Sequence, residues 1–156
     1  MYLTASMPDI MCVVRACARK STTGGCQFLG KRLIPWPCKK QTIVANSTTE
    51  AEYVAAASCC GQVLFQNQML DYGFNLMNTK IYINNESTIC IVKNPVFHSK
   101  TNLMEIRHHF IRDSYEKKLI HVIKIHTDHN VANLLTKAFD VGRFNFLVAS
   151  IGLLNL

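Results

Sequence analysis

The fold is decided by the stretch Ser47-Thr48-Thr49-Glu50-Ala51-Glu52-Tyr53-Val54-Ala55-Ala56-Ala57. Ser47 and Thr49 each precede a glutamate by three residues, as in a capping box, and a run of small residues follows. Gly73 supplies a stop signal. The pattern predicts a helix over residues 48–72.

The segments around this helix alternate between strand and helix patterns. Residues 26–29 and 32–38 predict a hairpin around Gly30 and Lys31, and Pro35 and Pro37 place its second strand at a sheet edge. After the helix, the chain predicts a strand at 80–84, helices at 87–93 and 103–114, a strand at 119–126 and an amphipathic helix at 131–138. This order is typical of a mixed α/β fold.

Composition limits the class of protein. The 156 residues are 49% hydrophobic and 17% charged, which suits one globular domain. The net charge of +7 favours a polyanionic partner, although scattered basic residues are also typical of an ordinary solvated surface. Seven cysteines form an odd set without a Cys-x-x-Cys pair, so we expect reduced, mostly buried thiols.

Targeting and metal signals are weak. His121, His126 and His129 form the densest histidine group, but no ligand set closes around them. The apolar N-terminus lacks a basic region before it, and Asp9 and Arg15 interrupt it, so we do not expect a signal peptide. No run reaches transmembrane length. We therefore expect an intracellular protein, cytoplasmic or nuclear, that contacts no membrane.

Four further motifs follow the helix in order. They are Ile81-Tyr82-Ile83-Asn84-Asn85-Glu86-Ser87, Lys93-Asn94-Pro95-Val96-Phe97-His98-Ser99-Lys100-Thr101, Ile106-Arg107-His108-His109-Phe110-Ile111-Arg112 and Asp128-His129-Asn130-Val131-Ala132-Asn133-Leu134-Leu135-Thr136-Lys137. With the helix, they resemble the ribonuclease H domain of copia-type LTR retrotransposon polyproteins, from about Lys20 to the C-terminus. The resemblance implies a ribonuclease H-like mixed sheet with flanking helices.

The same resemblance implies Mg²⁺-dependent cleavage of the RNA strand of an RNA/DNA hybrid, with four carboxylates holding two metal ions. The family's helix glutamate falls on Glu52. Its strand-end aspartate falls on Asn84, and the aspartate of its last helix falls on Asn133. The first-strand aspartate has no counterpart. We therefore expect a degenerate domain without hydrolase activity, in which Glu52 is at most a weak metal ligand and Mg²⁺ is not bound productively.

Residues 1–20 resemble a helix at the end of the reverse transcriptase in the same polyproteins. In that family a long segment separates this helix from the sequence matched by residues 20–24, whereas this chain joins the two directly. We therefore expect a reverse transcriptase remnant at 1–20 and, at 21–156, a truncated domain that lacks its central first strand. Residues 10–14 could fill the gap as a substitute strand, or the sheet could separate and leave a marginal fold. Good helix formers at 15–18 favour the second outcome.

Two alternatives concern the site. Glu86 or Asp128 could replace a missing carboxylate if the backbone were displaced, and Glu52 could be only a capping, solubilising acid.

Nucleic-acid binding could also persist without cleavage, because phosphate contacts use basic and hydroxyl groups. Trp36 is a stacking candidate or an ordinary core or edge residue. A translated relic without function is the last alternative. The candidate contacts to an RNA/DNA hybrid are Lys39, Lys40, Ser99, Lys100, Arg107, His108 and Lys137.

Overall fold

The computed structural model describes residues 10–16, 22–29, 32–33, 38–40, 44–67, 79–94 and 109–151. Its strands are β1 (Ile10–Ala16), β2 (Thr22–Leu29), β3 (Arg32–Leu33), β4 (Cys38–Lys40), β5 (Thr79–Ile83) and β6 (Ile120–Lys124). Its α-helices are α1 (Thr48–Asn67), α2 (Glu86–Lys93), α3 (Phe110–Glu116) and α4 (Val141–Ser150). Two short 3₁₀ helices, η5 (Thr127–His129) and η6 (Val131–Leu135), lie between β6 and α4.

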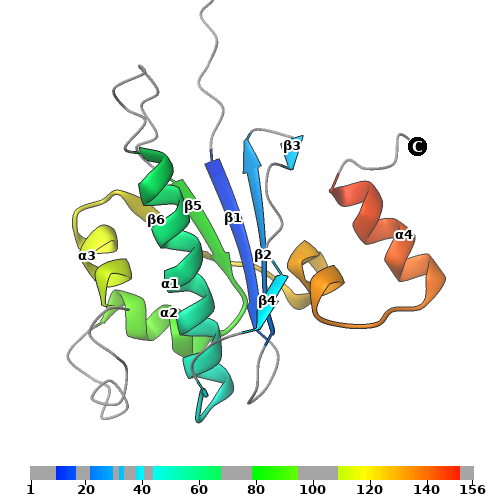
Figure 1. Ribbon diagram of the computed structural model, residues 1–156, viewed down its shortest axis with the longest axis horizontal. Helices are drawn as coiled ribbons and strands as arrows, with labels where there is room; N and C mark the ends of the chain where they lie inside the picture. The colour runs from blue at the N-terminus through cyan, green and yellow to red at the C-terminus, as the bar shows by residue number, and fades with distance from the viewer. Residues whose placement is uncertain are drawn as a thin grey trace, which may run out of the picture.

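The strands form one mixed sheet in the order β3-β2-β1-β5-β6, and β4 also pairs with β2. β1 runs antiparallel to β2 and parallel to β5, which in turn runs parallel to β6. Figure 1 shows α1, α2 and α3 on one side of the sheet and α4 on the other. The expected mixed sheet with flanking helices is therefore confirmed.

β1 occupies the centre of the sheet, and this corrects two expectations. The N-terminal segment was expected to be a helix, and the sheet was expected to lack its central strand. Instead, Met11, Cys12 and Val13 lie opposite residues 80–82 of β5, while the whole of β1 pairs with β2. The physical reason is that a gap between β2 and β5 would leave two rows of backbone donors and acceptors unpaired. That cost exceeds the helix preference of a few residues.

The residues of β1 suit this position because both faces of the strand are covered. Cys12 and Val14 are fully buried against the core beneath α1, whereas Val13 packs into the second core with η6 and α4. A strand buried on both faces has a nearly continuous hydrophobic sequence, and Ile-Met-Cys-Val-Val fits that description. β-branched residues at 10, 13 and 14 also favour a strand.

The start of α1 is as predicted. The Ser47 hydroxyl accepts a hydrogen bond from the Glu50 amide at 3.1 Å, and the Glu50 carboxylate accepts one from the Asn46 amide at 2.7 Å. The first bond satisfies an amide that the first turn of the helix leaves free, and the second ties the residue before the cap to that turn. Ser47 therefore caps the helix through Glu50, which leaves Glu52 out of the cap. The predicted end of α1, beyond Asn67, lies outside the described residues.

β5, α2 and β6 confirm the predicted strand at 80–84, helix at 87–93 and strand at 119–126. α3 overlaps the end of the predicted helix at 103–114, and residues 34–37 and 103–108 of the predicted elements lie outside the described residues. β2 and β3 are antiparallel, with Leu29 opposite Arg32, and the predicted turn residues Gly30 and Lys31 lie outside the described residues. Among the described strands, β3 and β4 pair only with β2. The predicted helix at 131–138 is instead the short 3₁₀ helix η6, and α4 was not predicted at all. Within the described part of the chain, no helix is long and apolar enough to cross a membrane.

Candidate functional site

The expected site residues gather where β1 and β5 end, side by side and parallel. Asn84 directly follows β5, and Asn133 lies in η6. Thr127 links them: its hydroxyl lies 3.5 Å from the Asn84 amide nitrogen, and its carbonyl accepts a hydrogen bond from Asn133 at 2.8 Å. The side-chain amide of Asn130 donates to the Val14 carbonyl at 3.1 Å and so ties η6 to β1.

Glu52 lies at the same place and pairs with an arginine that the sequence did not single out. The Arg15 guanidinium is 3.6 Å from the Glu52 carboxylate, and the two side chains are 21% and 4% exposed. Because Val13 lies opposite Tyr82, Arg15 stands two residues further along β1, level with Asn84. The helix glutamate therefore faces a cation that the chain itself provides. Only the central position of β1 makes this contact, which is why sequence reasoning missed it.

The environment of Glu52 opposes its ionisation. Burial raises the pKa of the Glu52 carboxyl to about 7, while Arg15, a hydrogen bond from Asn85 and the charge of Lys137 act to lower it. Desolvation outweighs these favourable contacts because the carboxylate is almost completely removed from water. Glu52 is therefore not the solvated surface acid that the alternative interpretation supposed.

Neither alternative acid joins this site, which corrects the suggestion that one could replace a missing carboxylate. Glu86 begins α2, is 72% exposed and pairs with Lys124. Asp128 is 65% exposed and pairs with His126 and Arg143. Across the described ranges, no group of three or more histidine, cysteine or acidic side chains is arranged to hold a metal ion.

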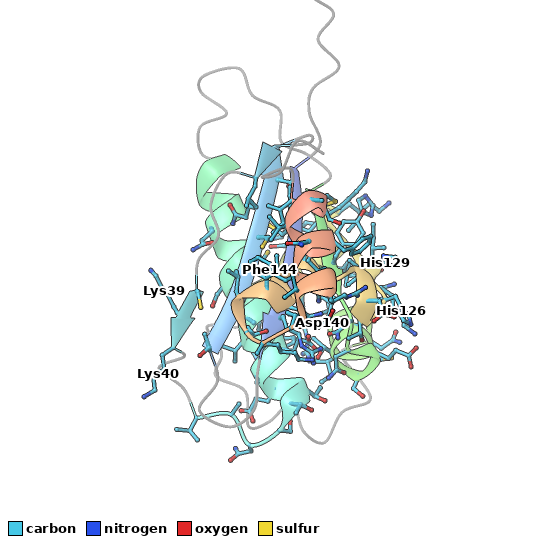
Figure 2. All side chains as sticks on the ribbon, turned by 90° about the vertical axis from the view of Figure 1, so that its right-hand side faces the viewer. Lys39, Lys40, His126, His129, Asp140 and Phe144 are labelled. Atoms are coloured by element: carbon cyan, nitrogen blue, oxygen red, sulfur yellow. The ribbon has the colours of Figure 1, made fainter. Side chains whose placement is uncertain are left out.

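The candidate nucleic-acid contacts lie in different parts of the chain, and only some of them are described. Lys39 and Lys40 are exposed on β4 and, as Figure 2 shows, project from the molecule on the side away from His126 and His129. Lys137 is exposed after η6 and close enough to Glu52 to affect its pKa. The remaining candidates, Ser99, Lys100, Arg107 and His108, lie outside the described residues, as does Trp36.

The cysteines agree in part with the expectation of mostly buried thiols. Cys12, Cys26, Cys59 and Cys60 are buried free thiols, while Cys38 and Cys90 are exposed free thiols. Burial raises the pKa of both Cys26 and Cys60 to about 12, so these groups are thiols and not thiolates at neutral pH. They therefore behave as small apolar core residues. The remaining cysteine, Cys17, lies outside the described residues.

The arrangement of the sheet and helices defines a ribonuclease H-like fold. The structure is similar to LC11-RNase H1, isolated from compost by a metagenomic approach, with a TM-score of 0.64 over 83% of this chain and 94% of that one. Sequence identity between the two is 16%, so this likeness concerns the fold.

Sequence comparison gives the family. The chain is 32% identical over 136 residues, 86% of its length, to the retrovirus-related Pol polyprotein from transposon TNT 1-94 of Nicotiana tabacum. It is 33% identical over 134 residues to the corresponding polyprotein from transposon RE1 of Arabidopsis thaliana. It spans about a tenth of the length of these relatives. No family model matches it. The chain belongs to the ribonuclease H-like part of these retrotransposon polyproteins, and the resemblance drawn from the sequence is confirmed.

The side chains at the site do not fit a pair of Mg²⁺ ions. Mg²⁺ is a hard cation that dehydrates reluctantly and favours anionic oxygens. The three expected positions supply one carboxylate, Glu52, and two neutral amides, Asn84 and Asn133, and Arg15 already balances the carboxylate. The donor set is therefore too weakly negative for two divalent ions.

Proposed function

We propose that this chain is a degenerate ribonuclease H-like domain that no longer cuts nucleic acid. Its ancestral role, by analogy with its family, is Mg²⁺-dependent cleavage of the RNA strand of an RNA/DNA hybrid. The observation that carries the proposal is the charge at the site: one carboxylate remains, and it is paired with Arg15. Loss of the metal ions removes the group that activates water and stabilises the leaving oxygen.

A cleavage assay tests the proposal. The purified chain, incubated with a labelled RNA/DNA hybrid in Mg²⁺ and separately in Mn²⁺, is expected to give no more product than buffer alone. Glu52→Gln is the matched control, because it removes the last carboxylate without changing the size of the side chain. Metal-dependent cleavage that disappears in Glu52→Gln would contradict the proposal.

A second candidate function is nucleic-acid binding without cleavage. It is supported by the net charge of +7 and by the adjacent exposed lysines Lys39 and Lys40 on β4. Such contacts displace counterions from phosphates and do not need the metal site. A surface of this kind would bind RNA/DNA hybrids and other nucleic acids with little sequence preference.

Fluorescence anisotropy with a labelled hybrid distinguishes this function from general positive charge. Lys39→Ala with Lys40→Ala is expected to weaken binding several-fold and to reduce the slope of log affinity against log salt by about one to two. The control is Lys117→Ala with Lys118→Ala, a second exposed lysine pair that follows α3. Equal losses in both double variants would contradict a specific role for β4.

A further inference from the structure

We propose that Arg15 is a built-in cation that takes the place of a divalent metal ion beside Glu52 and excludes such ions from the site. The inference concerns ion binding and not cleavage, so it can fail while the proposed function stands. It starts from the position of the strand: β1 fills the centre of the sheet and carries Arg15 to the end of α1 where Glu52 lies.

The charges at the site favour Arg15 over a divalent ion. Among Glu52, Asn84 and Asn133 only Glu52 can be anionic, and the Arg15 guanidinium, which is always protonated, offsets that single charge. A divalent ion entering beside Arg15 would add two positive charges to a site screened poorly by water. Lys137 adds further positive potential near the same carboxylate. The tethered cation therefore competes at an effective concentration that a free ion does not reach.

A second observation shows that the site retains ligand oxygens. The buried Oδ1 atoms of Asn84 and Asn133 accept no hydrogen bond among the described residues. Oε1 of Glu52 accepts none either, although it is the oxygen that lies 3.6 Å from the Arg15 guanidinium. Glu52 and Asn133 are each only 3% exposed. Buried acceptors without a hydrogen bond are uncommon and costly, and carboxylate and amide oxygens are the ligands that hard cations use. Removing the guanidinium and restoring negative charge should thus produce a cation site.

The test compares Mn²⁺ binding by titration calorimetry in three proteins. These are the unmodified chain, Asn84→Asp with Asn133→Asp, and the same pair combined with Arg15→Gln. We expect no binding by the first, weak binding by the second and binding tighter by about tenfold or more in the third. In the control, Arg143→Gln replaces Arg15→Gln, because Arg143 is a partly exposed arginine paired with Asp128. That control should resemble the double variant.

Several outcomes would overturn the proposal. Equal affinity in the double and triple variants would show that Arg15 does not exclude metal, and an equal gain in the Arg143 control would indicate net charge alone. A folded triple variant that does not bind Mn²⁺ would show that the oxygens do not converge. If Arg15→Gln leaves the triple variant unfolded, Mn²⁺ should restore its far-UV circular dichroism, because a ligand that binds the folded state stabilises it. Absence of that recovery also contradicts the proposal.

Discussion

α1 and β1 lie against each other in the core, yet their structures have different origins. α1 begins where its own residues dictate, at Ser47 with Glu50. β1 is a strand because β2 and β5 offer it hydrogen-bond partners on both sides. A local sequence signal therefore determines where a helix starts, whereas a central strand is determined by the hydrogen-bond partners on both sides of it. Substitutions in the two regions should therefore differ in cost.

The largest effect is expected from breaking β1 at its centre. Val13→Pro removes an amide and fixes the backbone in a strand paired on both sides, so we expect a loss of at least ~3 kcal/mol in the free energy of unfolding. Urea denaturation followed by circular dichroism measures the change.

The matched control for this substitution is Val141→Pro. Val141 is 77% exposed and is the first residue of α4 after its cap, Asp140, a position that tolerates proline. We expect a change within about 0.5 kcal/mol there. If Val13→Pro were equally mild, the chain would not depend on β1, and the sheet would be stable with its centre open.

The contrast between the two regions also explains which parts of the fold can be predicted from the sequence. The cap of α1 and the antiparallel pairing of β2 with β3 follow from residues close together in the chain. The strand at β1 does not follow in this way, because the helix formers after Val14 are outweighed by pairing with β2 and with β5, which is distant in sequence. α4 was missed although Asp140 supplies a capping signal: its side chain accepts a hydrogen bond from the Arg143 amide at 3.0 Å.

The residues of the site also differ in whether the local sequence predicts them. Asn84 and Asn133 were placed by motif and are joined through Thr127 in the structure. Arg15 could not be found in this way, since its contact with Glu52 exists only when β1 lies between β2 and β5. Asn130 was also missed, although its bond to the Val14 carbonyl fixes η6 against β1. Both residues act through the tertiary arrangement, which no local pattern encodes.

A smaller effect is expected where the two regions meet, at Glu52. Burial raises its pKa from an ordinary value of 4.5 to about 7, so the folded state binds a proton that the unfolded state releases between these values. The contribution of Glu52 to stability is therefore complete below about pH 4.5 and is lost as the pH rises to about 7. Because glutamine does not ionise, Glu52→Gln removes this fall in stability with rising pH. Relative to the unmodified chain, the variant should gain on the order of 2 kcal/mol between pH 4.5 and pH 8.

Chemical denaturation at several pH values measures this difference, and Glu86→Gln gives a control of opposite sign. The bond from Lys124 lowers the pKa of the exposed Glu86 carboxyl, so its contribution is present at neutral pH and lost on acidification. A difference between Glu52→Gln and the unmodified chain that did not change with pH would show that Glu52 ionises normally in the folded protein.

The smallest effect is expected at the start of α1, because a local signal makes a local contribution. Ser47→Ala removes the acceptor for the Glu50 amide and should cost about 1 kcal/mol, without changing the cooperativity of unfolding. Ser87→Ala is the control, since Ser87 is exposed within the first turn of α2, where Asn85 supplies the cap. It should be close to neutral. A loss at Ser47 as large as that of Val13→Pro would mean that α1, and not the filled centre of the sheet, determines whether this chain folds.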